Sequence, residues 1–180
     1  GLRVVELDGE EPSKAIMTQI LADLGADVIY IARPRRVRDL SVGAGRISES
    51  EALRWGLLRG KRGTVVDLKS EVERSRLVDL VEQAHVVVDN YRPGVLARLG
   101  IDVPAIVGGR RDLTWLSVTG FGHDGPWAGN PAYDVTVQAL GGSMSLTGNG
   151  PDRMPLRWGH PIGGLAGALF GAVGLLAHHL

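Results

Sequence analysis

The fold is decided by the stretch LRVVELDGEEPSKAIMTQILADLGADVIYIA, residues 2–32. It opens with one short apolar run, Leu2–Leu7, and closes with another, Ala26–Ala32, and both are typical of buried strands. Between them, apolar residues at helical spacing predict a helix from about Ser13 to Leu24, with Gly25 as its natural stop. Strand, helix and strand in this order form one unit of a parallel sheet.

The same alternation continues along the chain. Further elements are expected in the order helix, strand, helix, strand, strand: a helix at about residues 50–58, a strand at 64–68, a helix that starts after Ser70, and strands at 85–89 and 113–118. Ser70 and Glu73 form a capping box at the start of the second of these helices. That helix is predicted to bury Val72, Leu77, Leu80 and Val81. The sequence therefore predicts an α/β fold: a doubly wound, mostly parallel, Rossmann-like sheet covered on both faces.

Composition excludes several classes of function. The chain of 180 residues is long enough for one domain with a real core, and its 20 basic residues balance its 20 acidic ones. No overall charge draws it to nucleic acid or to an anionic membrane. It has no cysteine, which excludes disulfides and thiolate chemistry, and its five histidines have no metal-ligand spacing, so no metal is expected. No signal peptide is recognised, and we expect a cytoplasmic protein.

Known nucleotide and hydrolase motifs are missing. The turn after the first expected strand offers only Gly9 where a dinucleotide site needs three glycines, and Glu10 and Glu11 follow it. Residues 56–63 lack the spacing and the hydroxyl residue of a phosphate loop, and no serine nucleophile elbow occurs. In a doubly wound sheet the ligand binds beyond the carboxyl ends of the strands, so the segments after the strands are the candidate site.

The last predicted element is a Gly- and Ala-rich buried helix. Residues 162–177 carry no charge and contain five glycines. A membrane span needs about 20 predominantly apolar residues, so we expect a core helix rather than a membrane segment. Its apolar side is predicted to contain Leu165, Leu169, Ala172, Val173 and Leu176. Another side carries Gly164, Gly167, Gly171 and Gly174, where a second backbone can approach closely.

Five segments, in this order, resemble the family III CoA-transferases, which include formyl-CoA transferase, carnitine CoA-transferase and α-methylacyl-CoA racemase. They are TQILADLGADVIYI (18–31), RGKRGTVVDLK (59–69), VVVDNYRPGVLARLGI (86–101), SVTGFGHDGPWAGNPAYDVTVQALGGSMSLTG (117–148) and LRWGHPIGGLAGALFGAVGLLA (156–177). The resemblance implies that residues 1–180 are a single CoA-binding domain, and that the family's second domain is not in this chain. It also implies acyl-CoA or CoA as ligand, and a homodimer or heteromer of interlocked chains.

The resemblance assigns coenzyme A contacts to three residues of one turn and helix, Asn90, Tyr91 and Arg98. Tyr91 offers a flat surface for a purine and Arg98 a cation for phosphate; the alternative is an ordinary turn with a surface arginine. Arg33 is the preferred contact for the nucleotide end among Arg33, Arg35, Arg36 and Arg38, although such a loop is equally typical of solvated surface. Lys61 matches a family lysine near the CoA phosphates. The alternative is that Lys61 is simply a charged residue at the start of a strand.

The resemblance also implies the chemistry. Family transferases use a carboxylate just before the Gly- and Ala-rich helix, which attacks the thioester and forms a mixed anhydride; the released thiolate then gives an enzyme-linked CoA thioester. We place that position at Gly164, which has no nucleophile. A second departure is Ser13-Lys14-Ala15 in place of the family's Ala-Gly-Pro. His160 and Asp134 remain as candidates for acid–base work; the alternative for Asp134 is that it caps a helix beginning at Val135.

Three hypotheses stay open at the sequence level. In the first, the chain is the CoA-binding domain of a working transferase or racemase whose chemistry comes from another residue. In the second, it is a catalytically silent half that binds CoA and assembles with an active partner. In the third, it is an interaction module that no longer binds CoA.

Overall fold

The computed structural model describes residues 1–9, 13–34, 49–147 and 154–179. In chain order, the elements are β1 (Arg3–Leu7), α1 (Ser13–Asp23), β2 (Asp27–Ala32), α3 (Glu49–Leu57), β3 (Arg62–Val65), α4 (Glu71–Glu82), β4 (Val86–Asp89), α5 (Val95–Arg98), α6 (Val103–Gly108), β5 (Thr114–Ser117), α7 (Asp134–Leu140) and α8 (Ile162–His179). The predicted strands and helices are all present. The third strand lies nearer the N-terminus than expected, at Arg62–Val65 rather than 64–68.

The strands form one parallel sheet in the order β3-β2-β1-β4-β5. The chain moves outward from β1 to β3 on one side and then returns to β4 on the other side of β1. The winding direction therefore reverses between β1 and β4, and the region beyond their carboxyl ends is the topological switch point of the sheet. The prediction of a doubly wound parallel sheet is confirmed.

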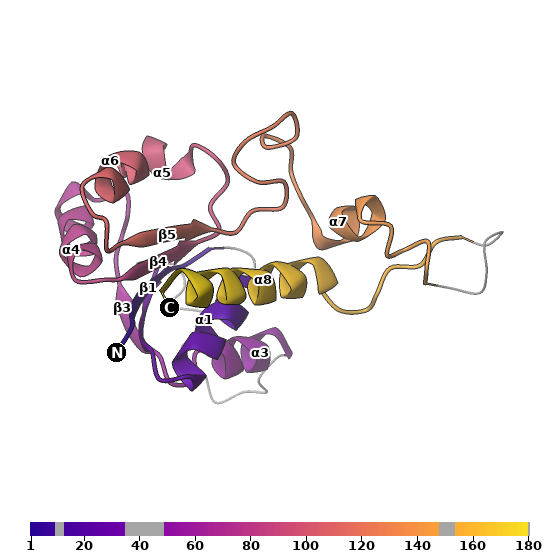
Figure 1. Ribbon diagram of the computed structural model, residues 1–180, viewed down its shortest axis with the longest axis horizontal. Helices are drawn as coiled ribbons and strands as arrows, with labels where there is room; N and C mark the ends of the chain where they lie inside the picture. The colour runs from indigo at the N-terminus through magenta and orange to yellow at the C-terminus, as the bar shows by residue number, and fades with distance from the viewer. Residues whose placement is uncertain (10–12, 35–48, 148–153, 180) are drawn as a thin grey trace.

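Helices cover both faces of the sheet (Figure 1). On one face, Leu7 and Val87 pack with Leu77 and Leu96 of α4 and α5. On the other face, apolar strand residues meet α1 and α8; the buried members of this cluster are Val4, Met17, Leu21, Val28, Val86, Val88, Ala168, Ala172 and Leu175. Neighbouring residues of a strand point to opposite faces, which is why these apolar runs feed two cores at once.

Helix α4 buries Leu77 and Val81 as predicted, whereas Leu80 is only partly buried and Val72 is exposed. Ser70 accepts a hydrogen bond from the Glu73 N–H at 3.4 Å, as the capping box requires, while the Glu73 carboxylate accepts from the Asp67 N–H at 2.6 Å. Leu77 is buried as expected, but Val72 is 73% exposed. A helix turns by about 100° per residue, so Val72 lies about 140° away from Leu77 and faces solvent.

Helix α8 is buried on one side only, which corrects the prediction of a buried helix. Its buried residues are Ala168, Ala172 and Leu175, and it lies along α1. A Cβ on Gly171 would come within 2.8 Å of the Met17 Sδ, so a side chain of α1, and not a second backbone as predicted, approaches the helix there, while a Cβ on Gly174 would meet nothing within 4 Å. The expected apolar side is right in part: Ala172 is buried, but Leu169 and Val173 are exposed. The packed side consists of Ala168, Ala172 and Leu175.

Helix α8 is also long and apolar enough to cross a membrane by length and composition alone, with a mean hydropathy of 1.4 over its 18 residues and 17% of them buried. Core helices of soluble proteins pass the same test, so this property is weak evidence for a membrane span.

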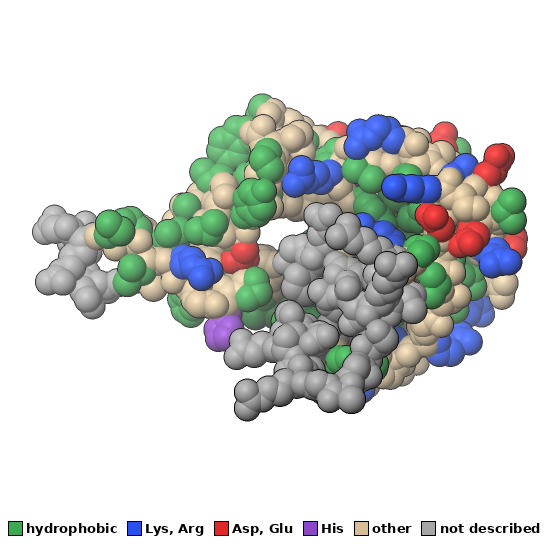
Figure 2. Space-filling view, turned by 180° about the vertical axis from the view of Figure 1, so that it is seen from behind, with side chains coloured by type: hydrophobic (Ala, Val, Ile, Leu, Met, Phe, Trp, Pro, Cys, Tyr) green, Lys and Arg blue, Asp and Glu red, His purple; other side chains and the backbone are tan. Residues whose placement is uncertain are grey.

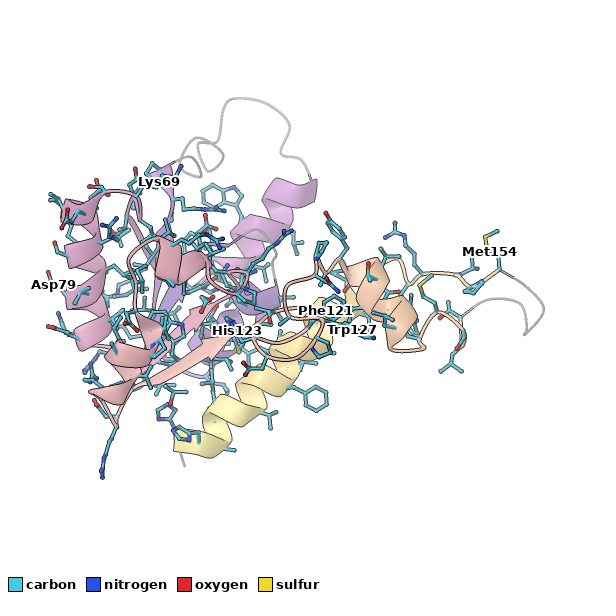
Figure 3. All side chains as sticks on the ribbon, turned by 90° about the horizontal axis from the view of Figure 1, so that it is seen from above. Lys69, Asp79, Phe121, His123, Trp127 and Met154 are labelled. Carbon is cyan, nitrogen blue, oxygen red and sulfur yellow. The ribbon has the colours of Figure 1, made fainter. Side chains whose placement is uncertain are left out.

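Residues 119–147 and 154–160, which we call the arm, protrude from the body and carry α7. Figure 2 shows hydrophobic side chains along its surface. Phe121 and Trp127 form an edge-to-face pair near its root, with ring centroids 5.7 Å apart, while Met154 lies at its far end (Figure 3). Among the described residues of the arm, only Gln138 is buried. The arm therefore has almost no core of its own.

Candidate functional site

Two predicted site segments meet at the switch point of the sheet. Gly9 lies two residues beyond the end of β1, and Asn90 directly follows β4. A Cβ on Gly9 would overlap the Asn90 Oδ1, at a separation of 1.5 Å. Only glycine leaves room for this contact, so the Asn90 side chain fills the space beside Gly9. Glu10 and Glu11, which the sequence analysis also singled out here, lie outside the described residues.

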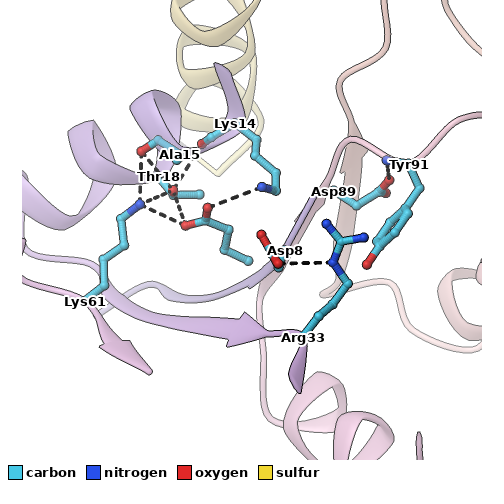
Figure 4. Close-up of polar contacts among 9 residues, drawn as sticks. Asp8, Lys14, Ala15, Thr18, Arg33, Lys61, Asp89 and Tyr91 are labelled. Carbon is cyan, nitrogen blue, oxygen red and sulfur yellow. Dashed lines mark hydrogen bonds and ion pairs between the residues drawn. The ribbon is translucent and has the colours of Figure 1, made fainter. Parts of the chain in front are cut away.

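Arg33 follows β2 and reaches the same edge. Its Nε donates to the Asp8 Oδ2 at 3.1 Å, and the Asp8 side chain is only 3% exposed whereas that of Arg33 is 35% exposed. The buried carboxylate therefore anchors the guanidinium, while part of the Arg33 side chain stays exposed. Figure 4 shows Arg33 between Asp8 and Tyr91. The other predicted loop residues, Arg35, Arg36 and Arg38, lie outside the described residues.

The turn that carries Tyr91 is organised by Asp89, which the sequence analysis missed. Asp89 is wholly buried, and its Oδ1 accepts from the Tyr91 N–H at 2.8 Å. Its Oδ2 accepts from the Trp115 Nε1 at 2.7 Å and the Ser117 Oγ at 2.6 Å. Both of these partners come from the neighbouring strand β5. A carboxylate closing an apolar strand was the available signal, but its partners lie far along the chain.

Tyr91 is half-buried beside this turn. Burial raises the pKa of its phenol to about 12. Its hydroxyl is enclosed and has no hydrogen-bond partner among the described residues. A buried polar atom without a partner is rare in a folded protein, so a ligand group there would satisfy it.

Arg98 closes the short helix α5, which begins after Gly94. Gly94 has a φ of 78°, a left-handed conformation that glycine adopts without strain. Arg98 is exposed and makes no hydrogen bond or ion pair with any residue that the structure describes. Its guanidinium is therefore available to a ligand.

Lys61 occupies a different environment from the one expected of a phosphate contact. Its ammonium donates to the Glu6 Oε2 at 2.8 Å, the Ala15 carbonyl at 3.0 Å and the Thr18 Oγ1 at 2.8 Å (Figure 4). The side chain is 1% exposed, and burial lowers its pKa. An ammonium has three donors, and all three are used within the chain. Lys14 joins the cluster, with its Nζ 3.7 Å from the Glu6 Oε1.

Gly164 lies inside α8. Because α8 begins at Ile162, Gly164 belongs to its first turn, and its N–H donates to the Asp134 Oδ1 at 3.1 Å. The residues just ahead of the helix are His160 and Pro161. The side chain of His160 is exposed.

Asp134 does not have the capping role considered for it. It is itself the first residue of α7; the N-cap is Tyr133, which makes no side-chain capping bond. The carboxylate instead caps the first turn of α8 across the fold, because Oδ1 accepts from the Gly164 N–H. Asp134 therefore does cap a helix, but that helix is α8 and not α7. The first residue of α8, Ile162, lies 28 residues after Asp134.

Among the described residues, no group of three or more acidic or histidine side chains is arranged to hold a metal ion.

Residues 1–180 match the family model of CoA-transferase family III. The acetyl-CoA:oxalate CoA-transferase of Acetobacter aceti is 37% identical over 154 residues, which cover 85% of this chain and 39% of that protein. The succinyl-CoA:mesaconate CoA-transferase of Haloarcula hispanica is 34% identical over 172 residues, covering 90% of this chain and 43% of that protein.

Among solved structures, a CAIB/BAIF family protein from Brucella suis is 34% identical and superimposes with a TM-score of 0.86, covering 98% of this chain and 47% of that one. The chain thus spans less than half the length of the relatives it matches.

Proposed function

Because the chain belongs to CoA-transferase family III, we propose that residues 1–180 are the CoA-binding domain of a protein that transfers CoA between an acyl-CoA and a carboxylic acid. The two curated relatives described above carry names of such transferases. Coenzyme A acts in this proposal as a substrate. We place the protein in the cytoplasm on the same premise.

One observation carries the proposal: the switch point of the sheet gathers groups suited to a nucleotide thiol. Arg33, Asn90 and Tyr91 follow the carboxyl ends of β2 and β4, and the free cation of Arg98 lies one short helix further on. A guanidinium binds phosphate with paired donors, and an aromatic ring stacks on a purine. Lys61 is left out of the proposed contacts, because all its donors are used inside the chain.

The acid–base group of the proposal is His160. The helix from Ile162 to His179 carries no carboxylate, so the mixed-anhydride route has no nucleophile there. His160 precedes the helix with an exposed imidazole, whereas both oxygens of Asp134 already accept hydrogen bonds. A histidine moves protons at neutral pH more readily than any other side chain.

Two alternatives deserve the same tests. The first is a catalytically silent subunit that binds CoA beside an active partner, which the absence of a carboxylate from α8 favours. The second is an enzyme like the α-methylacyl-CoA racemases, in which a base removes a proton from the acyl α-carbon. The exposed imidazole of His160 favours that chemistry.

We propose in addition that the chain assembles with a second copy or a related subunit. The outer side of α8 exposes Leu169, Phe170 and Val173. Contiguous apolar surface of this kind is typical of interfaces.

Calorimetric titration with CoA tests the binding proposal. Arg98→Ala is expected to weaken the affinity by roughly tenfold, because a charge-assisted hydrogen bond contributes about 1.5–3 kcal/mol. Arg111→Ala is the matched control: Arg111 is also exposed and without a partner among the described residues, but it precedes β5 at the opposite edge of the sheet. No binding at millimolar CoA would leave only the interaction-module hypothesis.

Mass spectrometry of CoA exchange between an acyl-CoA and free acids separates the enzyme from the silent subunit. The purified full-length protein, without any partner, is expected to exchange CoA and to lose that activity in His160→Ala. A protein that binds CoA but exchanges none supports the silent subunit.

A further inference from the structure

The side-chain amide of Gln138 joins two segments that are distant in the chain. Its Nε2 donates to the Asp134 Oδ2 at 2.5 Å and to the His160 carbonyl at 3.2 Å, and its Oε1 accepts from the Trp158 N–H at 2.8 Å. Rotating the amide by 180° would set donor against donor and acceptor against acceptor, so these partners fix its orientation.

The carboxylate of Asp134 extends this connection to α8. Its Oδ2 accepts a hydrogen bond from the Gln138 Nε2, and its Oδ1 accepts one from the Gly164 N–H at 3.1 Å. Side chains of α7 lie close against the backbone of α8 here, since a Cβ on Gly163 would lie 2.9 Å from the Val137 Cγ1 and 3.0 Å from the Asp134 Oδ1. One pair of side chains on α7 therefore holds both the segment before α8 and the first turn of α8.

The residue that these contacts flank is His160. Its carbonyl accepts from Gln138 and from the Ile162 N–H at 2.9 Å, while its side chain stays exposed. We infer that Gln138 is a positioning residue, which together with Asp134 fixes the backbone around His160 and so directs its imidazole. This inference rests on the proposed function, in which His160 is the acid–base group.

Packing cannot fix the position of residues 158–160, because the arm has almost no core. Met154, Leu156 and Trp158 are all exposed, and Gln138 is 3% exposed. Burying an amide is costly unless its hydrogen bonds are made, so a glutamine at such a site is stabilising only while it keeps its partners. The hydrogen bonds of Gln138 are therefore the main constraint on residues 158–160.

The first test is Gln138→Leu in the full chain, which keeps the side-chain bulk and removes the hydrogen bonds. The expected result is a kcat for CoA exchange lower by roughly 100-fold, since a displaced catalytic group costs about this much, with an unchanged KM for acyl-CoA. The NMR resonance of the His160 imidazole C2 proton, assigned by its loss in His160→Asn, is expected to shift.

Gln19→Leu is the matched control. Gln19 is 7% exposed and donates to the Asp23 Oδ1 at 3.0 Å, so it too is a buried helical glutamine paired with an aspartate one turn away. It bonds to no segment near His160. Gln19→Leu is expected to leave both kcat and the His160 resonance in place.

A double variant in which the amide of Gln138 and the carboxylate of Asp134 trade positions provides a second measurement if Gln138→Leu does not fold. Gln138→Glu alone sets two carboxylates against each other, and Asp134→Asn alone can set two amide donors against each other. The double variant restores one donor and one acceptor between the two positions, and it still lacks the bond to the His160 carbonyl. We expect it to fold better than either single variant and still to show the shifted His160 resonance.

The outcomes are distinct for the inference and for the proposed function. A His160 resonance that stays in place in Gln138→Leu or in the double variant overturns the positioning role, whatever the activity. A wild-type protein that binds no CoA and exchanges none refutes the proposed function, while the resonance experiment still decides the role of Gln138.

Discussion

At the scale of single residues, the buried charge cluster around Glu6 decides how α1 and β3 are joined. Glu6 is wholly buried and lies between two ammonium groups, those of Lys14 and Lys61. Removing one member of a buried, hydrogen-bonded ion pair is costly, because the remaining charge keeps its desolvation penalty. The cluster is therefore sensitive to the loss of any member.

Lys61→Met tests this sensitivity. We expect it to lower the free energy of unfolding by roughly 3 kcal/mol, measured by urea denaturation. Arg59→Met is the control, since the ion pair of Arg59 with Asp23 lies at the surface and is expected to matter far less. A Lys61 variant as stable as the Arg59 variant would contradict the buried cluster.

His85 links stability to pH. Burial lowers the pKa of this imidazole from its ordinary value of 6.5, and the Arg3 cation lowers it further. Its Nδ1 accepts a hydrogen bond from the Arg3 N–H at 3.0 Å, which requires the neutral form. The unfolded chain takes up a proton near pH 6.5 that the native protein resists, so His85 costs stability as the pH falls below that value.

His85→Asn keeps an acceptor for Arg3 and removes the titration. Between pH 7.5 and pH 5.5, we expect the wild-type melting temperature to fall further than that of this variant. His123→Asn, in an exposed loop of the arm, controls for the loss of any histidine (Figure 3). Equal pH dependence in all three proteins would rule out the role of His85.

At the scale of elements, α8 packs through its small residues. A Cβ on Gly171 would lie 2.8 Å from the Met17 Sδ and 3.2 Å from the Leu116 Cδ2, and Met17 is wholly buried, whereas a Cβ on Gly174 meets nothing within 4 Å. Gly171→Val is expected to destabilise the protein by about 1–3 kcal/mol through overpacking. Gly174→Ala is expected to stabilise it by up to about 1 kcal/mol, because alanine is the better helix former.

Urea denaturation of both variants measures the difference. The two glycines lie one turn apart in the same helix, so each serves as the control for the other. If both substitutions shift stability in the same direction, the contact between α8, α1 and the sheet is not the one described.

Elements with clear periodicity could be predicted from the sequence. The first strand, helix and strand followed from apolar runs around an amphipathic segment, and they place Arg33 after β2; the later apolar run of β4 places Asn90 at the same edge of the sheet. The faces of α8 could not be predicted, because every side of that helix is apolar or small. Which side of α8 packs depends on its contact with α1. Helix α1 ends at Asp23, more than 100 residues before α8 begins at Ile162.

The polar residues that organise the candidate site were harder to predict for the same reason. Asp89 and Gln138 are remarkable only for their partners, Trp115 and Ser117 for the first, Trp158 and His160 for the second. Those partners are distant in sequence and follow no spacing rule. Side chains that act through tertiary hydrogen bonds carry no local signal.

At the scale of the whole molecule, the described residues leave much apolar surface uncovered. Phe170 on α8 is 82% exposed and Val173 is 65% exposed, and on the arm Leu146 is 89% exposed. A monomer seldom exposes a large contiguous apolar patch, and a stable interface buries roughly 1,200–2,000 Å² in total. The proposed assembly with a second copy would cover the outer side of α8.

We therefore expect the chain to self-associate in sedimentation equilibrium, and Phe170→Asp with Val173→Asp to weaken that association at least tenfold, because two buried, unpaired carboxylates would oppose it. Val72→Asp is the control: Val72 is 73% exposed on α4, on the other face of the sheet, and its substitution is expected to leave association unchanged. A wild-type chain that stays monomeric contradicts assembly with a second copy and leaves only assembly with a related subunit. Co-sedimentation of α8 with lipid vesicles, abolished by the same double variant, would assign its apolar side to a membrane instead.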